Sequence, residues 1–298
     1  MVKALIRSMR LRTLPLSLAG VVCGGLLAQA EHGFNWWVFA LVLLTACALQ
    51  VLSNLSNEMG DQMSGVDGEG REGPNYSMTD GGLTVKQMWC AINAMVVVCC
   101  VSGLAMVVVS GSPWWLLLLG AAAIWAATHY TLGKKPYGYI GLGDLFVFIF
   151  FGLVSVLGSY FVVAGTVDCE RWLLLPAVGM GLLSVAVLNV NNIRDMQSDE
   201  GIRRTVPLRI GVRNARIYHT FLIVLGVGSF FFASVSLVQI IACSITVPVF
   251  VWHLYGVWKR EGRKLDPMLP LLVITTFVLA VLYSGVEPLL FGLFNSRC

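Results

Sequence analysis

Side chains with oxygen ligands gather just after the apolar run of residues 36–52. Asn54, Asn57 and Asp61 are spaced i, i+3 and i+7, so on a helix they share one face. Asp67 falls off that face, but the glycines around it would let the chain turn and bring its carboxylate back. The segment therefore predicts a polar site at the end of a long apolar helix.

A second segment repeats this arrangement far along the chain, at the end of the apolar run of residues 172–192. Asn191, Asp195 and Asp199 are spaced i, i+4 and i+8, which again forms one stripe on a helix. Either segment alone is better explained as a solvated helix end. Two such segments, each with Asn preceding Asp, favour the two halves of a single site.

Carboxylates beside a membrane span are costly and are usually functional. Asp and Asn oxygens suit a hard cation such as Mg²⁺, which typically keeps coordination positions for substrate phosphates. The predicted magnesium ligands are Asn57, Asp61, Asp67, Asn191, Asp195 and Asp199, and the four aspartates are the predicted catalytic residues.

Basic residues close to these acids predict an anionic substrate. Asn54, Asn57, Asn191, Arg71, Lys134, Arg203 and Arg204 are the candidates for holding a diphosphate. A metal ion and cationic side chains together are what a departing phosphate group requires. Lys134 and its neighbour Lys135 are equally well explained as anchors on the positively charged side of a membrane. An apolar protein that binds a diphosphate suggests a substrate with a long hydrocarbon tail.

The composition indicates a membrane protein built from helices. The chain is 57% hydrophobic and 12% charged, whereas roughly a quarter of the residues of ordinary globular proteins are charged. We predict an all-α bundle of nine transmembrane helices forming a single domain over residues 1–298. The predicted spans are residues 13–30, 36–57, 87–110, 114–131, 144–165, 172–192, 215–234, 237–257 and 268–292.

The basic residues predict the orientation of this bundle. All of the 20 Lys and Arg residues except Arg171 and Arg297 fall in the amino-terminal segment or the even-numbered loops. Positive loops stay on the cytoplasmic side, so the amino terminus and both acidic segments are expected to face the cytoplasm of a cell (inner) membrane. The net charge of +4 is thus a topology signal and requires no nucleic-acid partner.

With these features in hand, the chain resembles the UbiA-type intramembrane aromatic prenyltransferases, and most closely the branch that uses 1,4-dihydroxy-2-naphthoate. The resemblance covers essentially the whole chain and is carried by four motifs: RLRTLP at 10–15, NLSNEMGDQMSGVD at 54–67, YGYIGLGDLFVFIFFG at 137–152 and NNIRDMQSDEG…RTVPLRIG at 191–211. It departs from the family at Glu58 and Asp144, where Asp and Glu are usual, and at Ile202-Arg203, where Gly-Lys is usual.

This resemblance implies an Mg²⁺-dependent enzyme of menaquinone biosynthesis whose substrates are a polyprenyl diphosphate and 1,4-dihydroxy-2-naphthoate. The prenyl group would replace the carboxylate, with loss of CO₂ and diphosphate, to give demethylmenaquinol. Arg12 and Tyr130 are expected to contact the aromatic acceptor. Arg12 also fits a role as a topology determinant, and Tyr137 and Tyr139 fit an interfacial aromatic belt.

Two other functions remain open at this point. An enzyme of the same superfamily could use another aromatic acceptor such as 4-hydroxybenzoate, although the gap between Asp61 and Asp67 favours the naphthoate branch. An ion-coupled secondary transporter is the other alternative. Transporters usually place their sites at broken helices near the bilayer midplane, whereas both acidic segments here lie at helix ends on one side.

Overall fold

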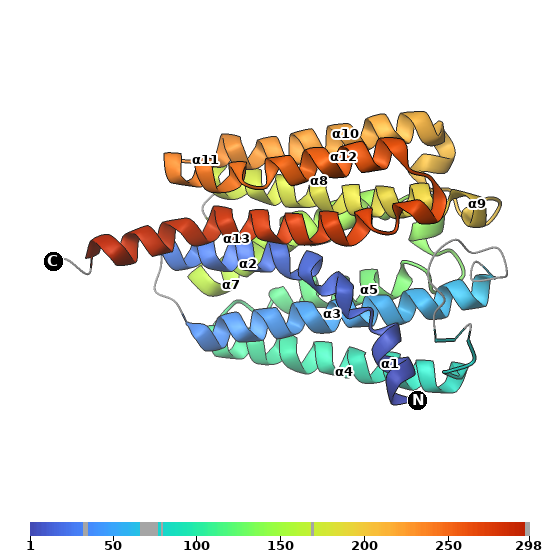
Figure 1. Ribbon diagram of the computed structural model, residues 1–298. Helices are drawn as coiled ribbons and strands as arrows, with labels where there is room; N and C mark the ends of the chain where they lie inside the picture. The colour runs from blue at the N-terminus through green and yellow to red at the C-terminus, as the bar shows by residue number, and fades with distance from the viewer. Residues whose placement is uncertain (32–34, 66–76, 79, 168–169, 296–298) are drawn as a thin grey trace.

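The protein is a bundle of long helices, as the computed structural model in Figure 1 shows. The structure describes residues 1–31, 35–65, 77–78, 80–167 and 170–295. Within these ranges there is no strand, and eight helical stretches are long and apolar enough to cross a membrane. An all-helical, polytopic membrane fold is therefore confirmed. The predicted span 114–131 is a shorter apolar helix, Leu116–His129.

The helices follow the predicted spans in order. The principal ones are α2 (Leu14–Glu31), α3 (Trp36–Ser64), α4 (Val85–Ser110), α5 (Leu116–His129), α6 (Gly143–Val147), α7 (Ser155–Ala164), α8 (Arg171–Arg194), α10 (Val206–Ala233), α11 (Leu237–Ser244), α12 (Val247–Lys259) and α13 (Met268–Asn295). Short helices α1 (Val2–Ser8) and α9 (Met196–Asp199) lie at the end of the bundle that also holds the amino terminus (Figure 1).

Local sequence signals explain where several helices begin and end. The Asn35 side chain accepts hydrogen bonds from the first free N–H groups of α3, and Thr84 forms a reciprocal capping box with Gln87 at the start of α4. At the other end of each helix a glycine adopts the left-handed conformation, Gly65 after α3 and Gly111 after α4. These caps fix the length of the helix that carries the first acidic segment.

The helices depart from the predicted spans in three places. Residues 148–154 between α6 and α7 form a π-helix, and α10 starts nine residues before the predicted span, with a non-helical Gly211 inside it. The predicted span 237–257 is interrupted between α11 and α12, where Pro248 enters the first turn of α12. Hydropathy measures how apolar a stretch is, so these changes of backbone path leave no trace in it.

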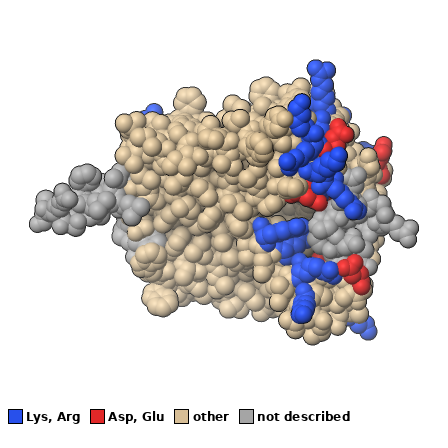
Figure 2. All heavy atoms as spheres, viewed as in Figure 1, with Lys and Arg blue, Asp and Glu red and all other residues tan. Residues whose placement is uncertain are grey.

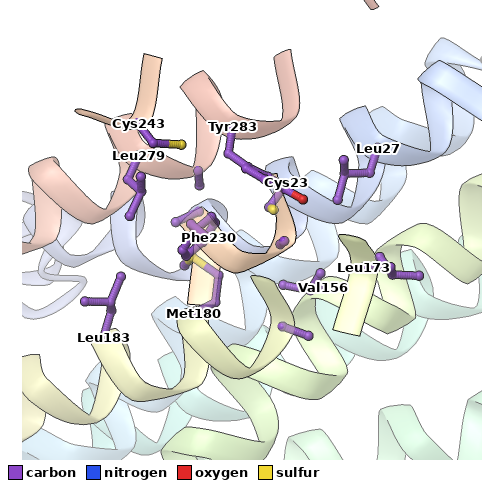
Figure 3. Packing of buried hydrophobic residues seen from close by; sticks show 14 of the residues in the cluster. Cys23, Leu27, Val156, Leu173, Met180, Leu183, Phe230, Cys243, Leu279 and Tyr283 are labelled. Atoms are coloured by element: carbon purple, nitrogen blue, oxygen red, sulfur yellow. The ribbon is translucent and has the colours of Figure 1, made fainter. Parts of the chain in front are cut away.

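The buried core lies mainly among α2, α7, α8, α10 and α13. Figure 3 shows Met180 and Leu183 of α8 near Phe230 of α10, with Tyr283 of α13 and Cys23 of α2 close by. Small residues let the backbones approach: a Cβ on Gly152 would lie 2.7 Å from the Ala177 carbonyl oxygen. Membrane helices pack mainly through such close contacts because lipid supplies little hydrophobic driving force. A second core joins α3 to α4.

Charged side chains are concentrated at one end of the bundle. Figure 2 shows most of the visible Lys, Arg, Asp and Glu atoms there, while the long sides are covered by uncharged residues. The carboxyl-terminal end of α3, the carboxyl-terminal end of α8 and the amino-terminal end of α13 all reach this polar end (Figure 1). The two acidic segments therefore emerge at the same end of the molecule.

Candidate active site

The first acidic segment occupies the last turns of α3, and the second occupies the junction of α8 and α9. Asp61 belongs to α3, Asp195 is the residue that ends α8, and Asp199 ends α9. All three side chains are buried, and Asp199 is only 1% exposed. A buried carboxylate is unfavourable unless a cation or hydrogen-bond donors compensate it.

Arg203 is the cation that joins the two segments. Its guanidinium forms an ion pair with Asp61, and its Nε lies 3.6 Å from Asp199 Oδ1. The same guanidinium lies 4.8 Å from the centre of the Tyr139 ring, and the Tyr139 hydroxyl donates a hydrogen bond of 3.1 Å to Asp61 Oδ1. One buried arginine thus contacts a carboxylate from each half of the predicted site.

The electrostatics of Arg203 and its tyrosine neighbours follow from this arrangement. Burial by itself would lower the pKa of the Arg203 guanidinium, but the Asp61 and Asp199 carboxylates outweigh it and raise that pKa. Burial raises the pKa of Tyr139 and of Tyr130, and the nearby acids act in the same direction. At neutral pH the site therefore contains a permanently charged guanidinium and protonated phenols.

A second arginine, Arg194, holds the other carboxylate. Its Nε and Nη2 donate to the two oxygens of Asp195 at 2.7 and 2.6 Å, and Nη2 also donates to Asn191 Oδ1 at 2.8 Å. Its Nη1 forms a 2.9 Å ion pair with Asp266, which lies two residues before the first residue of α13. Arg194 therefore ties the end of α8 to the start of α13 and fixes the Asp195 side chain.

The donor set fits a hard divalent cation in its chemistry. The residues concerned present carboxylate and amide oxygens, which Mg²⁺ prefers. In the described part of the chain, however, no three acidic, His or Cys side chains converge as ready-made metal ligands. Arg203 and Arg194 contact oxygens of these carboxylates instead. A metal ion would have to share or replace these arginine contacts.

A cavity of about 820 Å³ begins at this acidic cluster and extends into the bundle. Near the cluster it is lined by Asp61, Asp195, Asp199 and Arg203, and deeper it is bounded by apolar residues of α4, α5 and α7. This volume lies within the usual range of small-molecule sites, and the combination of a charged mouth with an apolar interior suits an amphiphilic ligand.

An aromatic wall borders the same cavity. The rings of Tyr137 and Phe146 stack with their centroids 4.1 Å apart, and Phe150 and Tyr130 extend the wall on either side. The π-helix that carries Phe150 begins within the motif at 137–152. Aromatic faces attract cations and stack on planar rings, so this wall can contact both a developing carbocation and an aromatic acceptor.

The structure distributes the other predicted residues unevenly. Asn57, Asn191, Arg12 and Tyr130 line the cavity, whereas Lys134 and Arg204 are exposed and are not part of its lining. Asp67 and Arg71 lie outside the described residues. The exposed Lys134 and Arg204 can reach a ligand only from the solvent side.

Asn54 is placed differently from its predicted role. Its Nδ2 donates at 2.9 Å to both the Met9 carbonyl and Thr13 Oγ1, and its Oδ1 accepts from Gln50 at 3.1 Å. The side chain is absent from the cavity lining and binds the amino-terminal segment instead. Residue spacing correctly places Asn54 on the same helix face as Asp61. Spacing does not determine which neighbouring segment the Asn54 amide contacts.

Sequence reasoning missed Arg194, Asp266 and Arg10 as residues of this cavity. The charges of Arg194 and Arg10 were explained as topology signals, an explanation that accounts for a basic residue at the end of any span. A usable signal was the position of Arg194 three residues after Asn191, a spacing that places the two side chains on one face of a helix. Arg10 has a left-handed backbone (φ 47°), which is uncommon for a residue other than glycine.

Comparisons with known proteins agree with this geometry. The sequence profile of the UbiA prenyltransferase family matches residues 17–276. The chain is 44% identical over 226 residues to the 1,4-dihydroxy-2-naphthoate octaprenyltransferase of Escherichia coli, covering 74% of this chain and 73% of that protein. It is 35% identical over 288 residues to the protein of the same name from Haemophilus influenzae, covering 92% of each.

The fold is also similar to a solved structure, that of a UbiA homolog from Archaeoglobus fulgidus bound to DMAPP and Mg²⁺. The TM-score is 0.70, with 95% of this chain and 98% of that chain covered. At 12% sequence identity, this likeness concerns the fold alone.

Proposed function

The chain belongs to the UbiA prenyltransferase family, and from that membership we propose that it transfers a polyprenyl group, octaprenyl in length, from its diphosphate to 1,4-dihydroxy-2-naphthoate. The transfer releases diphosphate and CO₂ and gives demethylmenaquinol for menaquinone biosynthesis. The acceptor and chain length follow the names of the relatives that share most of this chain. The observation that carries the proposal is Arg203, which contacts Asp61 and Asp199 together and so unites two distant acidic segments.

The diphosphate of the donor binds at the acidic mouth of the cavity. Asn57, Asp61, Asn191, Asp195 and Asp199 supply the oxygens that would hold Mg²⁺, with Asp67 completing the set from outside the described residues. When bound, Mg²⁺ supplies positive charge that draws electrons from the diphosphate and eases cleavage of the allylic C–O bond.

Arg203 has a second role in this site. Its guanidinium is planar and carries several donors, so it can pass from carboxylate oxygens to the oxygens of a diphosphate. Arg204, Lys134 and Arg71 are proposed to add positive charge from the solvent side, where the leaving diphosphate departs. These side chains thus stabilise the negative charge that grows on the leaving group.

The protein contributes position and shielding to the reaction. As the C–O bond breaks, its electron pair leaves with the diphosphate, and the aromatic wall of Tyr137, Phe146 and Phe150 faces the allylic carbon. The ring carbon that bears the carboxylate forms the new C–C bond. Loss of CO₂ then returns its electron pair to the ring, so no base is required for this step. Arg12 and Tyr130 hold the acceptor beside the donor.

We further propose that all nine helices cross the membrane, as one domain over residues 1–298, with the active site at the cytoplasmic face. Two observations support this: basic residues gather at one end of the bundle, and the Leu116–His129 helix lies between helices that are long and apolar enough to cross a membrane. The donor tail then lies in the apolar part of the cavity at the level of the bilayer.

Product mass spectrometry tests the proposed function. Membranes containing the protein are incubated with octaprenyl diphosphate and either 1,4-dihydroxy-2-naphthoate or 4-hydroxybenzoate, with Mg²⁺ or with EDTA. We expect a decarboxylated octaprenyl naphthalenediol that requires Mg²⁺. If only 4-hydroxybenzoate were prenylated, it would take the place of 1,4-dihydroxy-2-naphthoate as the proposed acceptor. If no prenylated product formed, the result would favour the hypothesis of an ion-coupled transporter.

A further inference from the structure

Gln50 of α3 presents a hydrogen-bond acceptor that the protein itself does not use. The residue is 8% exposed and belongs to the cavity lining. Its Nε2 donates at 3.1 Å to Thr13 Oγ1 and at 3.1 Å to Asn54 Oδ1. Its Oε1 is buried and has no hydrogen-bond partner anywhere in the described part of the chain.

The orientation of this amide follows from its neighbours. The Met9 carbonyl can only accept, so Asn54 must turn its Nδ2 toward it. Asn54 Oδ1 then faces Gln50, which must present Nε2 in turn. If the Gln50 amide were flipped, its Oε1 would face Asn54 Oδ1, and two acceptor oxygens would repel each other. Oε1 therefore points away from Asn54.

An unused acceptor in this position is energetically unfavourable. A buried polar atom without a partner costs more than a typical hydrogen bond contributes, so it is rarely retained without a role. Because the terminal torsion of a glutamine is soft, a small rotation presents Oε1 to a ligand without movement of the backbone. The atom that would satisfy it must be a donor, such as a hydroxyl.

Gln50 lines the same cavity as the acidic residues of α3, at a deeper level. Gln50, Ser53, Asn57 and Asp61 are spaced i, i+3, i+7 and i+11, and all four line the cavity. A helix rises 1.5 Å per residue, so Gln50 lies roughly 16 Å deeper than Asp61 along α3. That places it beyond the diphosphate and beside the segment that carries Arg12.

We propose that Gln50 is a specificity-determining residue whose Oε1 accepts a hydrogen bond from one hydroxyl of the aromatic acceptor. The inference rests on the proposed function, since a dihydroxylated acceptor provides the donor. Its partner in recognition is Arg12, which is suited to the carboxylate of the same ring. The aromatic acceptor is then held at two points, by a cation and by a neutral amide.

Two analogues of the acceptor test this inference in the wild-type protein. 1-Hydroxy-2-naphthoate and 4-hydroxy-2-naphthoate each lack one hydroxyl, and each is measured as a competitive inhibitor of 1,4-dihydroxy-2-naphthoate. We expect the two inhibition constants to differ by about tenfold, the scale of one neutral hydrogen bond, because one analogue leaves Oε1 without a partner. Equal constants would overturn the inference.

The variant Gln50→Met completes the test by removing the acceptor at nearly constant volume. It should raise the KM for dihydroxynaphthoate and the inhibition constant of the tighter analogue by about tenfold. The inhibition constant of the weaker analogue and the KM for the prenyl diphosphate should change by less than about twofold. An equal loss for both analogues would instead indicate a structural role for Gln50.

Thr45→Val serves as the matched control on the same helix and the same cavity. The Thr45 hydroxyl already donates to the Leu41 carbonyl at 2.8 Å, so the substitution should leave both inhibition constants unchanged. If the wild-type protein prenylates dihydroxynaphthoate but the two analogues inhibit it equally, only the proposed role of Gln50 is wrong. If it prenylates no dihydroxynaphthoate, the proposed function is overturned as well.

Discussion

Arg203 lies between the two acidic segments, where a diphosphate site that uses a metal ion requires positive charge. The resemblance to the prenyltransferases places a lysine there, and the arginine of this chain contacts both acidic halves and the face of Tyr139. A lysine carries the same charge but cannot form the planar, forked contacts of a guanidinium. The substitution at this position therefore tests whether charge or geometry matters.

We expect Arg203→Gln to reduce kcat/KM by about a hundredfold or more, since removal of one preorganised electrostatic group has that scale. Arg203→Lys should restore part of the loss, because it returns the charge. Steady-state rates with varied octaprenyl diphosphate check this, and thermal unfolding in detergent controls for folding. Full activity in Arg203→Gln would remove Arg203 from the site.

At the scale of single residues, the sequence predicted the acidic side chains more reliably than their partners. Asp61, Asp195 and Asp199 stand out because carboxylates are rare beside apolar spans. Asn54 has the same spacing as a ligand, yet its amide binds the amino-terminal segment. Spacing defines a helix face, but the neighbour that meets this face is decided by tertiary packing.

At the scale of the elements, Arg194 connects the ends of two helices through one side chain. It holds Asp195 with two hydrogen bonds and contacts Asp266 before α13. Because it orients a predicted metal ligand, it acts as a positioning residue for the site. Its effect should therefore appear in metal binding.

Arg194→Gln is expected to weaken the apparent affinity for Mg²⁺ by about tenfold to a hundredfold, the usual range for residues that orient metal ligands. Initial rates over a range of Mg²⁺ concentrations measure this affinity. Saturating Mg²⁺ should recover much of the activity. A loss of kcat with unchanged Mg²⁺ dependence would contradict the positioning role.

The contact between α8 and the π-helix depends on glycine. A Cβ on Gly181 would lie 2.6 Å from Phe148 Cδ2, so Gly181→Val forces the two helices apart. We expect a loss of about 1–3 kcal/mol of stability, the usual cost of overpacking. Thermal unfolding in detergent measures it. Gly228→Val on α10 is the matched control, because a Cβ there meets no atom within 4 Å; equal destabilisation of both variants would contradict this packing.

Composition predicted the existence and order of these helices because a span must be long and apolar to cross a bilayer. It could not predict the π-helix or the interruption between α11 and α12, since the residues involved remain apolar, nor the kink at Gly211, which lies before the apolar part of α10. Irregular backbone in a membrane protein is stabilised by neighbouring helices. Those contacts exist only after the bundle has formed.

At the scale of the whole molecule, the cavity runs from the polar end toward the opposite end of the bundle. Gly103 of α4, Gly120 of α5 and Gly158 of α7 line it, and a Cβ at Gly103 or Gly120 would meet no atom within 4 Å. The deep part of the cavity is therefore open at these positions. A long donor tail has room there.

Gly120→Leu should fill this space and act on long donors selectively. We expect about a tenfold lower kcat/KM with octaprenyl diphosphate, the scale of an overpacked apolar site, and little change with geranyl diphosphate. Competition between the two donors, analysed by product mass spectrometry, gives the ratio directly. Gly228→Leu, outside the cavity, should leave the ratio unchanged. An unaltered ratio in Gly120→Leu would place the tail elsewhere.

Two acidic helix ends, distant along the chain, are proposed to form one site for a divalent cation and a diphosphate. Electron paramagnetic resonance of Mn²⁺, added with an unreactive thiolodiphosphate analogue of the donor, tests it most directly. We expect wild-type protein to bind Mn²⁺ only with the analogue, and Asp61→Asn and Asp199→Asn each to abolish this binding. Retention of normal binding after either substitution would contradict it, because that half of the site would then hold no metal.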